Sequence, residues 1–175
     1  LLQMTVRKDG SSKFGEDSRW GTFPSIALGW KIDQENFFPK DFFISTLKLR
    51  ASWGQLGNEA ALGYYSANTL IKTGNSLGNG YVQGVGSNPW PGSIATALEN
   101  RNLQWETTDS KNVGIDFTLK SGKISGSMNY YHNVTDNLLI TKRLAPSAGI
   151  DNPILNVGKI SNSGFELEVN YRDQV

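Results

Sequence analysis

The chain has 175 residues, a net charge of +1 and no cysteine. Disulfides and thiolate metal sites are therefore excluded, and the charge gives no basic surface of the size that nucleic acid requires. Apolar runs stay far below the roughly 20 residues of a transmembrane helix. The 19 glycines, together with 8 phenylalanines, 6 tyrosines and 5 tryptophans, are typical of antiparallel β structure with long loops.

The first part of the chain predicts three strands, each with one apolar and one polar face. In residues 2–7 the apolar side chains hold the even positions, which is the two-residue period of a strand. After a polar loop over 9–21, the same alternation returns in 22–32 and again in 43–54. Residues 33–42 between these two strands predict a short connection with room for one helical turn.

The second part begins with a long irregular region, 55–104, and continues with three further strands. A region of this length is typical of a functional loop, and residues 64–67 predict a short hairpin extension within it. A tight turn at Ser121-Gly122 and a loop over 144–157 separate the later strands. These strands are predicted over 105–119, from 123 onward with an extension through 138–140, and over 159–173.

The connections alternate in length along the chain, from long to short and back. In an up-and-down sheet this order gathers the short turns at one end and the long loops at the other, as in transmembrane barrels. The sequence therefore predicts an all-β fold of about six antiparallel up-and-down strands, which form part of a large transmembrane β-barrel and cannot close it alone. Trp30, Phe37 and Phe38 would lie at the periplasmic rim, and Trp53 toward the outer rim. A soluble sandwich or meander fits the same alternation.

Several segments resemble the SusC/RagA family of TonB-linked outer-membrane proteins. They stand in the family's order and cover most of the chain outside the long loop: residues 5–15, 21–30, 47–58, 102–108 and 156–167. The resemblance implies that residues 1–175 are a central-to-late part of a TonB-dependent receptor barrel. The family's plug domain, TonB-contacting segment and signal peptide have no counterpart in this sequence.

The resemblance also implies a function, a location and partners. The expected function is TonB-dependent uptake of an oligosaccharide or peptide across the bacterial outer membrane, with TonB acting through the plug region. A SusD-like surface lipoprotein would close the barrel from outside, outer-membrane lipid would surround it, and no cofactor is implied. The alternative is a soluble or surface-exposed carbohydrate-binding β-domain without transport activity.

No residue pattern in the sequence predicts an enzyme or a metal site. His132 is the only histidine and is interpreted as an ordinary strand-end residue. No group of His, Asp and Glu has metal-ligand spacing. Exposed aromatic side chains can stack on sugars or peptides or anchor a partner protein. The candidate contacts in the long loop are Trp90, Tyr81, Tyr64 and Tyr65.

Charged residues on the polar faces of the strands form a second group of candidates. They are predicted to face the lumen, since a charge that faces lipid costs energy in a depth-dependent way. These residues are Arg7, Lys48, Arg50, Asp116, Glu166 and Glu168. Because the third and fourth predicted strands are neighbours, Lys48 or Arg50 is expected to face Asp116.

Overall fold

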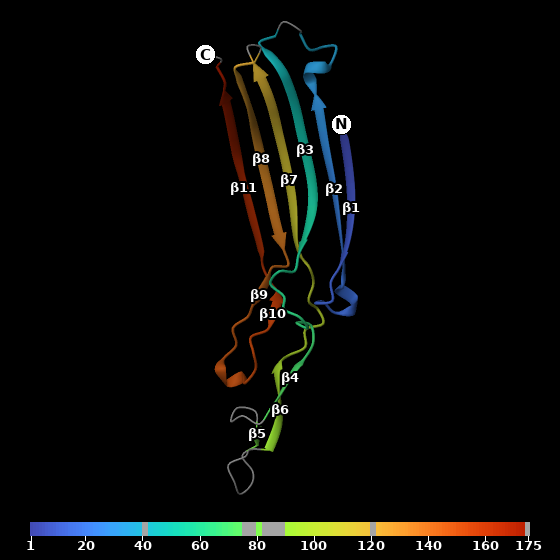
Figure 1. Cartoon of the computed structure of the whole chain (residues 1–175), viewed down its shortest axis with the longest axis vertical. Coiled ribbons are helices and arrows are strands. Elements are labelled where there is room, and N and C mark those ends of the chain that lie inside the picture. Colours follow the sequence, from blue (N-terminus) through green and yellow to red (C-terminus); the bar gives the residue numbers. More distant parts are fainter. Residues whose placement is uncertain (40–41, 75–79, 82–89, 120–121, 174–175) are drawn as a thin grey trace.

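A single antiparallel sheet of six long strands forms most of the molecule (Figure 1). The computed structural model describes residues 1–39, 42–74, 80–81, 90–119 and 122–173. In sheet order the strands are β1 (Leu2–Gly10), β2 (Trp20–Lys31), β3 (Ile44–Asn58), β7 (Glu106–Leu119), β8 (Ile124–Asp136) and β11 (Lys159–Tyr171).

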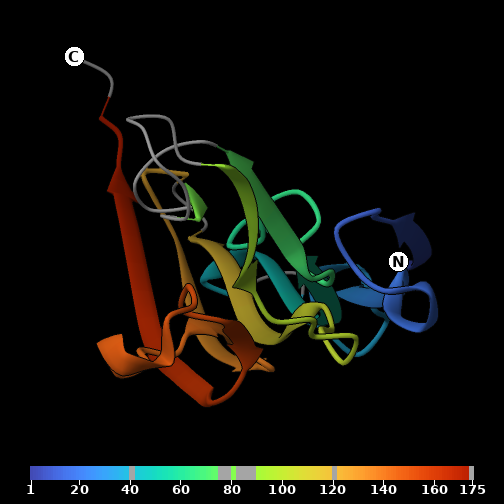
Figure 2. The same cartoon turned by 90° about the horizontal axis from the view of Figure 1, so that it is seen from below.

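Each long strand pairs with the next long strand along the chain, so the sheet is an up-and-down meander. It does not close, because β1 and β11 lie at its two opposite edges, as the view along the long axis shows (Figure 2). The predicted fold of six antiparallel strands in an open sheet is confirmed. No helix in the described part of the chain is both long and apolar enough to cross a membrane.

The short connections gather at one end of the sheet and the long loops at the other (Figure 1). At the turn end, the β2–β3 connection contains the 3-10 turn η2 (Ile32–Gln34), and the Asp33 carboxylate accepts a hydrogen bond of 3.1 Å from the Leu47 amide. The β7–β8 turn is closed by the Gly122 amide, which donates to Leu119 at 2.8 Å with Gly122 at φ 68°. The predicted turn residue Ser121 lies outside the described residues.

At the loop end the chain differs from the predicted elements. The strand predicted to reach 138–140 ends at Asp136, because Asn137 has φ 56° and breaks the extended backbone. The next residues form a separate strand, β9 (Leu139–Thr141), which pairs with β10 (Ile154–Asn156) inside the predicted loop. Two further 3-10 turns lie in the loops at this end, η1 (Glu16–Ser18) and η3 (Pro146–Ala148).

The region predicted as an irregular loop contains a small sheet of its own. It consists of β4 (Leu70–Gly74), β5 (Gly80–Tyr81) and β6 (Trp90–Ala97), with β6 between the other two. The hairpin predicted at residues 64–67 is wrong. These residues form a turn instead, in which Tyr65 has φ 62° and its carbonyl accepts a hydrogen bond of 2.9 Å from the Asn68 amide.

The register between the strands separates two faces across the whole sheet. Met4 pairs with Ile26, Leu49 with Ile115, and Met128 with Leu167, so that apolar residues meet apolar residues at each step. None of these residues belongs to the buried core. The apolar face comprises Leu2, Met4, Val6, Ile26, Leu28, Leu47, Leu49, Ala51, Val113, Ile115, Phe117, Met128, Tyr130, Phe165, Leu167 and Val169.

The buried core lies at the loop end rather than under the sheet. Its members come from loops that are distant in sequence: Phe14, Leu62, Ala67, Leu103 and Leu139, with Trp105 and Ile154 packed against them. Phe23 is also buried, on the polar face near this core, where its ring meets Trp105 edge-on at 5.5 Å. The long loops are therefore packed together, whereas the apolar face of the sheet has no covering layer in the described part of the chain.

We predict that Gly57→Ala destabilises the loop end of the sheet. A Cβ atom at Gly57 would collide with the ring of Phe23, which is only 5% exposed and is held by Trp105. Overpacking of this kind costs about 1–3 kcal/mol, measurable as a lower free energy of unfolding of the full-length barrel in urea. Gly63→Ala is the control, since its Cβ would have only an ordinary contact of 3.7 Å with Ser66. Equal stability of the two variants would contradict the proposed close packing.

Candidate functional site

The face opposite the apolar one carries small polar and charged side chains in rows that run across the sheet. All six charged residues predicted to share a face do so. In the middle of the sheet the rows are uncharged, made of hydroxyl, amide and very small residues. One such row is Thr5, Ser25, Gly54, Ser110, Asn133 and Asn162, and the next is Gln3, Ala27, Ser52, Asn112, Tyr131 and Gly164.

Toward the turn end the rows become charged, and the two signs are separated. Lys31 and Lys48 are paired in register on β2 and β3, and Lys48 is paired in turn with Asp116 on β7. Glu166 and Glu168 lie beyond, on β11. In this part of the face, cations therefore stand on the β2–β3 side and anions on the β7–β11 side.

Arg50 joins the two sides. Its Nη2 donates to Asp116 Oδ1 at 2.8 Å and to Asn129 Oδ1 at 2.9 Å, bridging β3, β7 and β8. A Cβ atom at Gly114, which lies opposite Arg50, would collide with the amide of Asn129, so the absence of a side chain there opens the path that the guanidinium takes. Lys48 is the register partner of Asp116, but the longer Arg50 side chain makes the ion pair.

Near the loop end the polar face is covered by aromatic rings. The Arg7 guanidinium lies 5.8 Å from the centroid of the Phe23 ring and forms an ion pair of 2.8 Å with Asp9. Trp105 then links Phe23 to Phe14, with ring centroids 4.8 Å apart in the second pair. This aromatic cluster joins the polar face to the core of the loops.

Residues of these polar rows line two hollows on the sheet. One of about 400 Å³ lies near the loop end and another of about 490 Å³ nearer the turn end. Their polar lining includes Gln3, Thr5, Arg7, Ser25, Lys48, Arg50, Ser52, Ser110 and Asn112. Amides, hydroxyls and charges of this kind hydrogen-bond to hydrated polar solutes. Among the described residues, no group of His, Asp and Glu could hold a metal ion.

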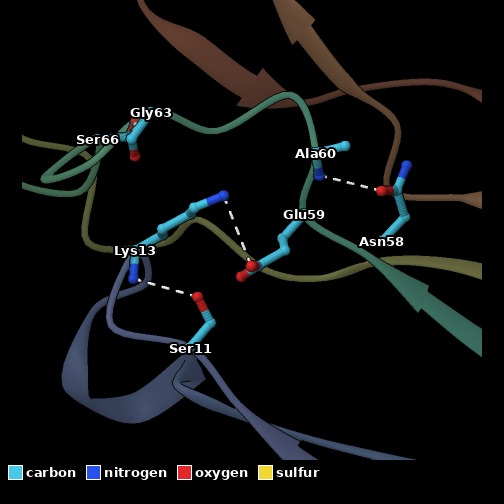
Figure 3. A network of polar contacts seen from close by, with 7 residues as sticks. All are labelled: Ser11, Lys13, Asn58, Glu59, Ala60, Gly63 and Ser66. Carbon is cyan, nitrogen blue, oxygen red and sulfur yellow. Dashed lines mark hydrogen bonds and ion pairs between the residues drawn. The ribbon is translucent and has the colours of Figure 1, made fainter.

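Polar contacts link the segments at the loop end of the sheet (Figure 3). The Lys13 ammonium lies 3.5 Å from the Glu59 carboxylate and so ties the β1–β2 loop to the segment after β3. The Asn58 side chain accepts from the Ala60 amide at 3.0 Å. Elsewhere the Asn156 side-chain amide donates to the carbonyls of Gln104 at 2.8 Å and Asn137 at 2.9 Å, which joins the β8–β11 loop to the start of β7.

The aromatic candidates belong to the region between β3 and β7 and not to the strands of the large sheet. Tyr64 and Tyr65 are 80% and 66% exposed on the turn that follows β3. Tyr81 and Trp90 are register partners between β5 and β6. In the same region the exposed Arg101 donates to Glu99, and this hydrogen bond raises the pKa of the Arg101 guanidinium.

One polar pair was not predicted by the sequence analysis. Lys111 and His132 are register partners on the apolar face, at the end nearer the loops. His132 had been interpreted as an ordinary strand-end residue, and Lys111 lies at the start of the alternating segment of its strand. Continuing that alternation backward from Val113 would have placed Lys111 on the apolar side.

An open antiparallel sheet with one apolar and one polar face, short turns at one end and long loops at the other, is a sector of the wall of a membrane-spanning β-barrel. A family model described as TonB dependent receptor-like, beta-barrel matches residues 1–174. The chain belongs to this family, and it is an outer-membrane protein.

Individual relatives agree with this assignment. The chain is 36% identical over 171 residues to TonB-dependent receptor SusC of Bacteroides thetaiotaomicron, and 37% identical over 169 residues to TonB-dependent receptor P39 of Formosa agariphila. Each match covers 97% of this chain but only 17% and 15% of the respective relative. The solved RagAB peptide importer in its 'closed-closed' state superposes with a TM-score of 0.82 at 25% identity, over 99% of this chain and 18% of that chain. The resemblance to the SusC/RagA family is thereby confirmed.

We predict that Asp116→Asn weakens the sheet slightly, because it removes the charge that Arg50 binds. Both side chains are about a third exposed, so solvent screens the pair and the expected loss is about 0.5–1 kcal/mol in the free energy of unfolding. Urea titration of the full-length barrel measures it. Glu99→Gln, which breaks the more exposed pair with Arg101, is the control and should leave stability unchanged. A loss no larger for Asp116→Asn than for this control would show that Arg50 does not stabilise the sheet.

Proposed function

We propose that the chain is a six-strand sector of an outer-membrane importer, with its apolar face toward lipid and its polar face toward the lumen. The observation that carries the proposal is the exposed apolar face, on which Phe165 and Leu167 are 80% and 67% exposed. Arg7, Lys48, Arg50, Asp116, Glu166 and Glu168 then line the lumen. Trp30 and Phe37, whose rings meet at 6.2 Å near the turn end, belong to the periplasmic aromatic girdle together with Phe38.

The cargo in this proposal is an oligosaccharide or a peptide. Relatives of the chain include a receptor named SusC and an importer named for peptides. The polar face offers hydroxyl and amide rows beside charges of both signs, which suits hydrated solutes that form many hydrogen bonds. Energy would reach the barrel from TonB through the plug region of the full-length protein.

A SusD-like lipoprotein is the proposed partner at the loop end. The loops there are packed through a shared core and present Tyr64 and Tyr65 to solvent. Tyr65 holds a left-handed backbone conformation, which is unfavourable for a residue of its size and is found where surrounding structure imposes it. Large aromatic side chains of this kind are frequent anchors at interfaces.

The soluble carbohydrate-binding alternative fits the molecule less well. A soluble domain would have to cover its large apolar face, and the described residues supply no layer for it. The sheet also has two unpaired edges, β1 and β11, which in a free domain invite aggregation. Further strands of a barrel and surrounding lipid would satisfy both requirements.

We predict that a charge is tolerated on one face of the sheet and not on the other. Phe117→Lys places an ammonium in the apolar face and should cost about 2–4 kcal/mol if that face meets the bilayer centre. Ser127→Lys, on the polar face of the neighbouring strand, is the matched control. The measurement is the yield of folded full-length barrel in outer membranes, judged by heat-modifiable migration. Normal assembly of Phe117→Lys with failed assembly of Ser127→Lys would reverse the proposed orientation.

We predict that uptake depends on the exposed tyrosines. In a strain that lacks the full-length gene, the wild-type gene should restore growth on the imported oligosaccharide or peptide as sole carbon source. The double variant Tyr64→Ala, Tyr65→Ala should assemble normally but restore growth several-fold more slowly and retain less lipoprotein on purification, since a hot-spot aromatic at an interface contributes about 2 kcal/mol or more. Phe43→Ala, an exposed aromatic at the turn end, is the control. A deletion strain that grows normally on every such nutrient would refute the importer.

A further inference from the structure

A hollow of about 360 Å³ lies on the apolar face, where the proposed function places lipid. Lys111, Val113, Tyr130 and His132 line it. The register pairs Lys111 with His132 and Val113 with Tyr130, so the lining consists of two adjacent cross-strand pairs on β7 and β8. The hollow therefore has an apolar half toward the turn end and a half with two nitrogen-bearing side chains toward the loop end.

This hollow lies at the boundary of the apolar face. Toward the turn end, the next pair is Ile115 and Met128, which is apolar. Toward the loop end the next pair contains Asp109. Trp53 is the register partner of Lys111 on the other side, and its indole N–H donates to Asp109 at 2.6 Å. A tryptophan with its ring beside apolar residues and its N–H bound to a polar group is typical of a membrane–water interface.

The two basic groups of the hollow have no partner among the described contacts. Lys111 forms none of the ion pairs, and neither it nor His132 takes part in a side-chain hydrogen bond, in the part of the chain that the structure describes. The neighbouring carboxylate on this face, Asp109, is already engaged: one oxygen accepts from Trp53, and the other accepts from Gln55 at 3.2 Å. Ser163, the register partner of His132 on β11, carries no charge.

We propose that Lys111 and His132 bind the phosphate group of a phosphorylated membrane lipid in the leaflet on the loop side. The ammonium and an imidazole N–H donate to phosphate oxygens, and charge-assisted hydrogen bonds of this type are the stronger ones. The first part of an acyl chain lies against Val113 and Tyr130. A lipid fits better than free phosphate because only a lipid fills both halves of the hollow. The inference rests on the proposed function, which puts this face against the bilayer.

The test measures lipid retention by the full-length importer in detergent, using native mass spectrometry. Dioleoyl phosphatidic acid is the probe, dioleoyl phosphatidylcholine is the lipid without net charge, and inorganic phosphate is the competitor without an acyl chain. The double variant Lys111→Gln, His132→Gln should retain phosphatidic acid at least about fivefold less than the wild type, the change expected for removing a surface charge worth about 1 kcal/mol. Lys72→Gln, an exposed lysine of β4, is the matched control and should bind as the wild type does.

Each result assigns the failure to one of the two proposals. Equal retention of phosphatidic acid by the double variant and the wild type would overturn the lipid site. Equal retention of both lipids by the wild type, or displacement of phosphatidic acid by millimolar phosphate, would also overturn it. In these cases the proposed importer still stands if the full-length wild-type gene restores growth of the deletion strain on the nutrient. A wild type that retains neither lipid would overturn the lipid site as well. If, in addition, Phe117→Lys assembles normally and Ser127→Lys does not, the proposed orientation itself is wrong.

Discussion

The strand register is the constraint on which the rest of the structure depends. Side chains alternate between faces along a strand, so a slip of one residue between any two strands would move a whole apolar set to the polar side. Across the six strands the pairing avoids this, and Met4 and Leu167 at opposite edges still share a face. Both the apolar face and the charged rows of the polar face follow from this one alignment.

Among the described residues, buried apolar side chains are confined to the loop end. A soluble domain buries apolar residues between layers, but here the buried set joins loops, from Phe14 in the first to Leu139 in the last. The sheet is held instead by its backbone ladders and by cross-strand contacts such as Arg50 with Asp116. This division is what a barrel wall requires, since lipid takes the place of a second protein layer on the apolar face.

Much of the fold could be predicted from alternation, because a long strand with two different faces carries a clear period. The contact between the third and fourth predicted strands was predicted for the same reason, but the choice between Lys48 and Arg50 depended on side-chain reach and on the space at Gly114. The sheet of β4, β5 and β6 was missed, since its strands are short and separated by glycine-rich sequence. That Lys111 and His132 are neighbours could be seen only from the register itself.

The shared core of the loops has a mechanical consequence. Residues from the β1–β2, β3–β7 and β8–β11 connections are packed into one cluster, and the Lys13–Glu59 contact adds a polar link between the first two. Closely packed groups resist local deformation and transmit displacement to their neighbours. A displacement of the turn at Tyr65 would therefore be transmitted to all three connections. These connections would move together as one rigid unit.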